Sequence, residues 1–240
     1  MKILNILPFA VSTILLSPMV NASNFVPSEE FATSEKYLKQ LTTKTGVLLM
    51  GGCPTASKCQ QTRKEFEEFC RKVPTDEFCV PVAFMHDKTV NEFALNPNDG
   101  KKAIELFKLA CEGFSGGGAC FFLGNKYTEG KIVEKSEEEA AKYYGAACSK
   151  KIVKGCRGAM ESYYSLTLNR DQKYAKETFH FGDLACSYSD VDVCLAMGDF
   201  YSRGFGGSRN LKNAKEYYQK ACDFGYQAGC NRLKEIEISQ

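Results

Sequence analysis

Cysteine is the residue type with which this chain could do the most chemistry. Its 240 residues include twelve cysteines, and a thiol can form a disulfide, bind a metal ion or exchange disulfides. Ten of them form pairs whose members are eight or nine residues apart: Cys70 and Cys79, Cys111 and Cys120, Cys148 and Cys156, Cys186 and Cys194, and Cys222 and Cys230. The last four second members follow one another at 36, 38 and 36 residues. A fixed interval of this length is typical of stacked structural repeats.

The spacing within the pairs favours disulfides over a metal site. Zinc sites use cysteines two to four residues apart with further Cys or His ligands nearby, whereas this chain has two histidines, His86 and His180, far apart. We therefore expect each recurrent pair to form a local bridge that stabilises the fold by about 2.5 kcal/mol. Cys53 and Cys59 lie outside the pattern and form either a sixth disulfide or a reactive pair. No Cys-x-x-Cys occurs, which argues against a disulfide oxidoreductase.

The first 22 residues have the pattern of a secretory signal peptide. A basic start at Lys2 is followed by an apolar run from Ile3 to Leu16 and by small residues ending at Ala22. The run is shorter than the roughly 20 apolar residues of a membrane-spanning helix, and no later stretch qualifies. We expect an exported protein, periplasmic or secreted, without a membrane span. An oxidising compartment agrees with the disulfides.

Between the cysteine pairs the periodicity is helical. Ala140, Tyr144 and Cys148 recur every four residues on one face, and Ser136 with Glu139 three positions later forms a capping box. This pattern predicts a helix that starts after Ser136.

The ends of neighbouring helices are marked as well. Asn210 is a candidate N-cap for the matching helix that leads to Cys222. Gly130 and Gly204 are expected to end the short helices that follow Cys120 and Cys194. The repeated unit is therefore a helix, a glycine-containing loop, a second helix and a bridged turn.

These units predict an all-α fold. A hairpin of two short helices buries too little apolar surface to fold alone, so successive hairpins must stack. We expect a right-handed αα superhelix of about five hairpins with repeat-bridging disulfides and one concave face. The domain prediction is a signal peptide over 1–22, an N-terminal capping segment over 23–60 and a repeat solenoid over 61–240.

The motif resembles a known repeat. The segment from Gly124 to Ala147 carries the motif residues Gly124, Tyr127, Gly130, Val133, Ser136, Ala140, Tyr143, Tyr144 and Ala147. The segment from Gly198 to Ala221 has a parallel pattern. Both resemble the Sel-one-like repeat, a relative of the tetratricopeptide repeat. Combined with bridging cysteine pairs behind a signal peptide, the pattern is similar to the Helicobacter cysteine-rich protein family. The unit from Cys156 to Cys186 departs from it, with Met160, Leu166 and Phe181-Gly182 at the motif positions.

The resemblance implies two classes of function. Members are secreted helical solenoids that bind proteins or peptides, and several are labelled penicillin-binding protein or weak beta-lactamase. Serine beta-lactamases need Ser-x-x-Lys and Ser-Asp-Asn, which are absent here, while Lys44-Thr45-Gly46 is an isolated match. We therefore expect a binding scaffold rather than an enzyme and keep beta-lactam hydrolysis as the alternative.

The binding surface can be predicted by aligning the helices on the second cysteine. The third, fourth and seventh residues after it are the recurring core set, so the first and fifth face elsewhere together. By resemblance these positions line the concave groove, where we expect a protein or peptide partner; an ordinary solvated helix face is the other interpretation. They are Phe121 and Asn125, Arg157 and Glu161, Leu195 and Asp199, and Asn231 and Glu235, with Tyr164 and Arg203 at the rim.

Charge and composition limit the other partners. The formal net charge is +2, with acidic and basic residues interspersed, so nothing suggests nucleic acid or an acidic membrane surface. We expect a monomer with no cofactor and no metal.

Overall fold

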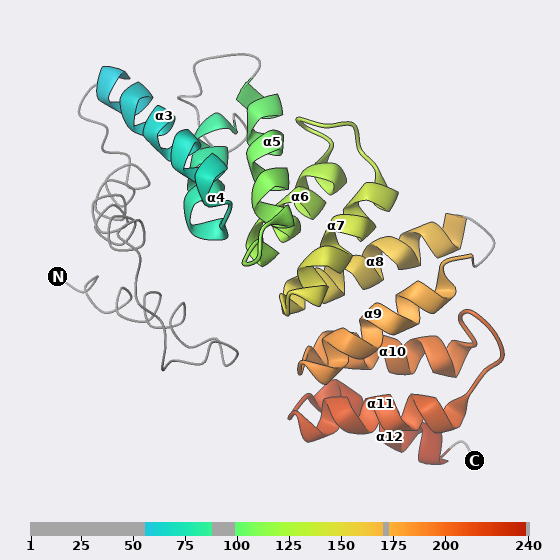
Figure 1. Cartoon of the computed structure of the whole chain (residues 1–240). Helices are drawn as coiled ribbons and strands as arrows, with labels where there is room; N and C mark the ends of the chain where they lie inside the picture. Colours follow the sequence, from blue (N-terminus) through green and yellow to red (C-terminus); the bar gives the residue numbers. More distant parts are fainter. Residues whose placement is uncertain (1–55, 88–98, 170–172, 239–240) are drawn as a thin grey trace, which may run out of the picture. The chain divides into compact units, whose positions relative to one another are not determined.

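The computed structural model describes residues 56–87, 99–169 and 173–238, and over these residues it contains helices and no strand. The predicted all-α fold is confirmed. In chain order (Figure 1) the helices are α3 (Ala56–Lys72), α4 (Asp76–His86), α5 (Asp99–Glu112), α6 (Gly117–Glu129), α7 (Glu137–Ser149), α8 (Val153–Asn169), α9 (Ala175–Ser187), α10 (Val191–Arg203), α11 (Leu211–Asp223) and α12 (Gln227–Ile238).

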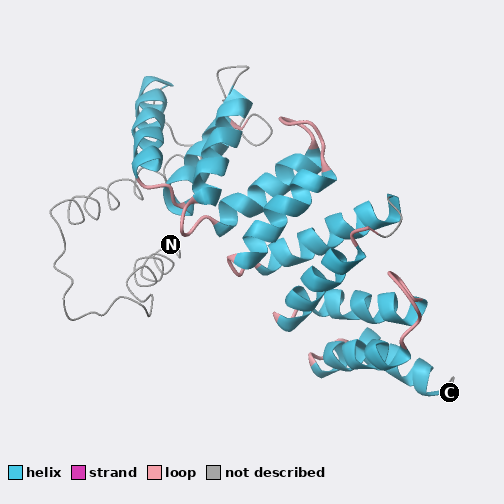
Figure 2. Cartoon of the chain, turned by 45° about the vertical axis from the view of Figure 1, so that its right-hand side comes forward, coloured by secondary structure: helices cyan, strands magenta, loops and turns pink. Residues whose placement is uncertain are grey.

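The helices alternate between two kinds. We call α4, α6, α8, α10 and α12, which carry the second cysteine of each pair, the A helices, and α3, α5, α7, α9 and α11 the B helices. Each helix packs chiefly against the next one in the chain, and weaker contacts join helices of one kind, such as α6 with α8. The short turns from a B helix to the next A helix lie along one edge, and the loops from α6 to α7 and from α10 to α11 lie along the other (Figures 1 and 2).

The predicted helix ends are confirmed. The Ser136 side chain accepts a hydrogen bond from the Glu139 N–H, and the Asn210 side chain accepts one from the Asn213 N–H. Gly130 and Gly204 end α6 and α10 with φ of 68° and 75°, a left-handed conformation in which a side chain is strained. The chain thus encodes these helix boundaries locally.

Five of the six predicted disulfides are present. They are Cys70–Cys79, Cys111–Cys120, Cys148–Cys156, Cys186–Cys194 and Cys222–Cys230. Each joins the end of a B helix to the start of the next A helix, so it fixes one hairpin to its successor. Cys53 lies outside the described residues, so the Cys53–Cys59 pairing stays a prediction.

Aromatic rings packed on glycines bring the two kinds of helix together. A Cβ added to Gly124 in α6 would lie 2.4 Å from Tyr144 Cδ1, and one added to Gly158 in α8 would lie 2.9 Å from the same atom. The Tyr144 ring therefore fills the space that both glycines leave open. Gly198 in α10 faces Tyr218 of α11 in the same way, at 2.4 Å.

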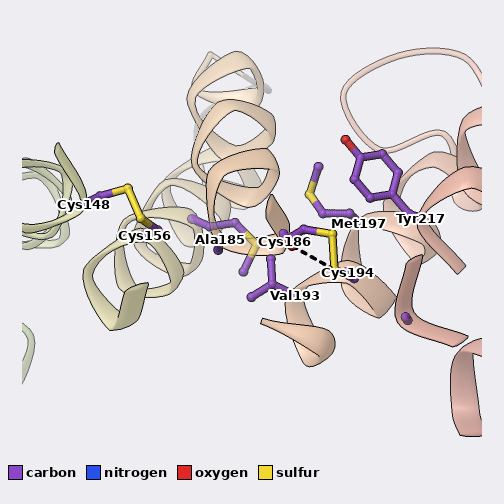
Figure 3. Close-up of a cluster of buried hydrophobic side chains, with 10 residues drawn as sticks. Cys148, Cys156, Ala185, Cys186, Val193, Cys194, Met197 and Tyr217 are labelled. Carbon is purple, nitrogen blue, oxygen red and sulfur yellow. Dashed lines mark hydrogen bonds between the residues drawn. A yellow bond between two sulfur atoms is a disulfide. The ribbon is translucent and has the colours of Figure 1, made fainter. Parts of the chain in front are cut away.

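The atypical repeat solves the same packing problem differently. In α9, Gly182 stands where α7 and α11 have Tyr144 and Tyr218, and Met197 of α10 packs against it. Figure 3 shows Met197 in the buried cluster around the disulfides of α7 to α10, with Tyr217 beside it. The flexible thioether fills the gap left by the missing ring.

The predicted signal peptide and most of the predicted capping segment lie outside the described residues. In the part of the chain that the structure covers, no helix combines the length and apolarity required to span a membrane.

Candidate protein-binding surface

The six residues predicted to bind a partner lie on three A helices. Phe121 and Asn125 are on α6, Arg157 and Glu161 on α8, and Leu195 and Asp199 on α10. Their surroundings differ between the two regular repeats and the atypical one.

In the first regular repeat Asn125 contacts the other helix of its own hairpin. The Tyr144 hydroxyl of α7 donates a hydrogen bond to Asn125 Oδ1 at 2.7 Å, and Thr128 Oγ1 lies 3.2 Å from the same hydroxyl. Asn125 thus links α6 to α7 and is half-buried.

The second regular repeat has the same arrangement with a carboxylate. The buried Tyr218 hydroxyl of α11 donates to Asp199 Oδ1 at 2.6 Å and lies 3.3 Å from Ser202 Oγ. Burial, and then the hydrogen bond to Asp199, raise the pKa of Tyr218 to about 12. Arg232 of α12 approaches the same carboxylate at 3.7 Å, so Asp199 joins three helices.

The apolar positions contact the same tyrosines. The Phe121 ring lies 5.7 Å from that of Tyr144, and Leu195 packs against the cluster that contains Tyr218. Four of the six predicted residues therefore hold the B-helix tyrosines in place, a role that the sequence reasoning missed.

A signal for that role was present in the sequence. Asn125 lies five residues after Cys120, and Tyr144 lies four residues before Cys148. Asp199 and Tyr218 have the same offsets from Cys194 and Cys222. In an earlier repeat the corresponding residues are Phe84 and Phe107, whose rings meet edge to face at 5.3 Å. The two positions thus vary together as a contact pair.

The atypical repeat leaves its two predicted residues on the surface. Because α9 has Gly182 in place of the tyrosine, Glu161 has no hydroxyl to accept from and lies exposed. One turn before it, Arg157 pairs with both carboxylate oxygens of Asp190 and contacts Asp192 at 3.1 Å. The hydrogen bonds that Arg157 donates to Asp190 raise the pKa of Arg157, so its charge is fixed.

An aromatic cluster extends this surface. The Tyr164 ring of α8 stacks on Phe200 of α10 at 4.9 Å and lies 5.1 Å from Phe205 in the following loop. All three rings are half-buried, so each presents part of its surface to solvent. We define the α8–α10 patch as Arg157, Glu161, Tyr164, Asp192, Phe200 and Phe205.

The remaining predicted positions lie near the patch or beyond it. Arg203, Asn231 and Glu235 are exposed, and Glu235 pairs with Arg232 at 3.2 Å within α12. Their role in binding stays a prediction.

The described residues were compared with the requirements of a metal site. They contain no group of three or more His, Cys, Asp or Glu side chains placed to hold a metal ion. His86 is buried against Glu67 with 2.6 Å between Nε2 and Oε1, while His180 is exposed on α9. Lys44-Thr45-Gly46 lies outside the described residues.

The comparison with protein families identifies the repeat. The model of the Sel1 repeat matches residues 96–113, 118–151 and 191–226. The predicted Sel-one-like repeats are thus confirmed, and the matches leave out the atypical unit between Cys156 and Cys186.

Individual proteins are similar at low identity. Cytochrome c oxidase assembly factor 7 of Xenopus tropicalis is 24% identical over 137 residues, 54% of this chain and 58% of that protein. A protective antigen of uropathogenic Escherichia coli that displays an SLR fold aligns with a TM-score of 0.54 and 22% identity over 72% of this chain. Cysteine rich protein B of Helicobacter pylori aligns with a TM-score of 0.29 and 24% identity over 75% of this chain and 98% of its own.

The chain covers only part of two of these proteins. It spans 58% of the length of the Xenopus protein and 36% of the Escherichia coli antigen. The likeness to the antigen shows the fold alone.

Proposed function

Because the chain carries Sel1 repeats, we propose that it is an exported, disulfide-bridged scaffold that binds a protein or peptide partner through its A helices. Sel1 repeats mediate protein interaction, and five disulfides fit an oxidising compartment. The A-helix face is the one we expect to be concave. Within it, the α8–α10 patch is the proposed centre of binding.

The observation that carries this proposal is the release of Arg157 and Glu161 from hairpin packing. Nη1 of Arg157 makes no hydrogen bond within the described residues, since its bonds to Asp190 and Asp192 use Nε and Nη2. The Glu161 carboxylate is exposed one helical turn away. A donor and an acceptor at this spacing suit the carbonyl and N–H groups of a bound peptide segment.

The aromatic part of the patch supports the same proposal. Tyrosine, phenylalanine and arginine are enriched at the centres of protein interfaces, because they bury much surface with few rotatable bonds. Tyr164, Phe200 and Phe205 contact one another, so their positions are fixed before a partner binds. The name of the Xenopus relative describes an assembly factor, which is consistent with a scaffold role.

A charge reversal at Glu161 tests the proposal. The oxidised protein would be immobilised and used to capture partners from envelope and culture extracts, with proteins identified by mass spectrometry. We expect the Glu161→Arg variant to lose a partner that the wild type retains, because the carboxylate acceptor is replaced by a cation. Glu161 is exposed, so the fold should be unaffected.

The matched control is Lys176→Glu, an exposed charge reversal on the B helix of the same repeat. It should retain the partner. Capture of the same proteins by all three forms, or of none by the wild type, would contradict binding at the α8–α10 patch.

A further inference from the structure

The bridged turns, which connect each B helix to the next A helix inside a disulfide loop, share an exposed residue. Six residues before the second cysteine, four of the five turns have a large apolar side chain exposed to solvent. These are Phe114, which is 95% exposed, Phe224 at 48%, Tyr188 at 40% and Val73 at 37%.

This exposure is a property of the position and not of scattered residues. Four of the six large hydrophobic side chains that are exposed in the described part of the chain occupy this one position. The disulfide closes the turn at both ends, which restricts the ring from folding back onto the helices. Because the bridged turns follow one edge of the array (Figures 1 and 2), the four side chains belong to that edge.

The fifth turn has a cation at the same position. Lys150 stands six residues before Cys156, and Lys151 follows it with φ of 64°. Between this turn and the one that carries Phe114 lies an open pocket of about 340 Å³, lined by Phe114, Gly117, Lys150, Lys151 and Ile152. The pocket thus combines an exposed ring, an aliphatic side chain and two ammonium groups.

The two lysines of the pocket are in different states. Lys150 Nζ donates a hydrogen bond to the Gly113 carbonyl of the neighbouring turn. The Lys151 side chain is exposed, and its ammonium group has no ion pair or hydrogen bond to any described residue. One positive charge is therefore free to meet an anion beside the Phe114 ring.

We propose that this pocket docks an acidic segment of another protein, with a carboxylate on Lys151 and a neighbouring large apolar side chain against Phe114 and Ile152. The proposed site lies at the bridged-turn edge and is independent of the α8–α10 patch. A ring without a local partner and a cation without a counter-ion are complementary to an apolar side chain next to a carboxylate.

Charge favours this partner over two others. An anionic lipid surface would cover the whole edge and would meet the exposed carboxylates of Glu112 and Asp223 in its turns, whereas one acidic side chain of a peptide can contact Lys151 alone. In a two-fold pairing of two copies through the pocket, Lys151 of one copy would face Lys151 of the other, and like charges oppose such contact.

The test is fluorescence anisotropy with short labelled peptides and the oxidised protein. The first probe alternates phenylalanine, glutamate, leucine and glutamate between Gly-Ser ends. In the second probe lysine replaces both glutamates, and in the third probe serine replaces the phenylalanine and the leucine. We expect the first to bind and the other two to bind at least about tenfold more weakly, because each lacks one half of the recognition.

Two variants locate the site. Lys151→Glu and Phe114→Ser should each weaken binding of the first probe by about fivefold or more. Phe224→Ser removes an equivalent ring from another bridged turn and should change the affinity by less than about twofold, and so should Glu161→Arg on the other surface. All four side chains are exposed, and circular dichroism would confirm that each variant is folded.

Four outcomes would overturn the proposal. They are equal binding of all three probes, no binding of the first probe, unchanged affinity in Lys151→Glu, and an equal loss in Phe224→Ser. Phe114-dependent binding to phosphatidylcholine–phosphatidylglycerol vesicles without peptide binding would assign the edge to a membrane surface. Phe114-dependent self-association in sedimentation velocity, again without peptide binding, would assign it to a second copy.

Discussion

Tyr218 shows how a single hydroxyl group connects the two helices of a hairpin. The side chain is 2% exposed, and its hydroxyl donates to Asp199 on the preceding helix. The ring packs on Gly198, so the same residue supplies both the apolar and the polar part of the contact. Removing the hydroxyl would leave a partly buried carboxylate with one donor fewer.

We predict a pH dependence from this group. The folded-state pKa of Tyr218 is raised from 10.0 to about 12, so the native state favours the protonated phenol. This stabilisation is fully present below the unfolded pKa, near pH 10, and is lost as the pH rises towards 12. Tyr218→Phe should be less stable than the wild type by about 1–2 kcal/mol at pH 8, and the difference should shrink above pH 10.

Urea unfolding of both proteins between pH 8 and 11 would measure the difference. Tyr188→Phe is the control. Because Tyr188 is 40% exposed, removing its hydroxyl should leave the free energy of unfolding nearly unchanged. A Tyr218→Phe difference that is constant with pH, or that grows above pH 10, would contradict the assignment.

The role of a residue could be predicted from the sequence where the residue that it contacts is close to it in the chain. The Ser136 cap, its partner three residues later, and the disulfides with separations of eight or nine were predicted correctly. The role of Asn125 was not predicted, because its partner Tyr144 is 19 residues away on another helix. Whether a polar side chain meets solvent or a neighbouring helix depends on hairpin geometry, which periodicity within one helix does not contain.

At the scale of helices, α8 and α10 are connected through the first turn of α10. Asp190 is the N-cap of α10 and accepts a hydrogen bond from the Val193 N–H at 3.3 Å. The same carboxylate accepts from Arg157 Nε of α8 at 2.7 Å. The Asp190 side chain therefore caps the N-terminus of α10 and also joins α10 to α8, the preceding A helix.

We predict that Asp190→Ala destabilises the protein by about 2 kcal/mol, since it removes a helix cap and the main partner of Arg157. Thermal unfolding would measure the loss, and hydrogen exchange should show faster opening of the first turn of α10. Asp192→Ala is the control, because this carboxylate is 56% exposed and is not the cap. It should cost less than about 0.5 kcal/mol, and an equal loss in both variants would contradict the role of the cap.

The existence and order of the helices were predictable because each hairpin repeats the same local signals. The packing of the atypical hairpin was not, because it depends on Met197 filling the space beside Gly182 from the following A helix. A missing tyrosine is visible in the sequence, but the side chain that replaces it comes from another element.

For the whole molecule, the disulfides hold a chain of nearest-neighbour contacts together. In an array of this kind stability is close to a sum of hairpin and interface contributions, so the effect of a bridge depends on its place. Each bridge closes a loop of similar length and contributes about 2.5 kcal/mol in the chain-entropy description.

We predict that replacing both Cys148 and Cys156 by alanine destabilises the α7–α8 boundary and divides unfolding into two transitions. Replacing both Cys222 and Cys230 should instead loosen α12 alone, because no described helix follows it. Denaturant unfolding followed by circular dichroism and by hydrogen exchange would distinguish the two patterns. A single unchanged transition in the central variant would show that the array remains cooperative without that bridge.

The short separation within each cysteine pair also bears on how the chain acquires its covalent bonds. Partners eight or nine residues apart meet sooner than cysteines of different pairs, because the entropy of loop closure rises with length. Each pair can therefore close before its cysteines meet those of another pair. Correct connectivity then follows from the short separation alone, and the number of repeats can change without creating ambiguous pairings.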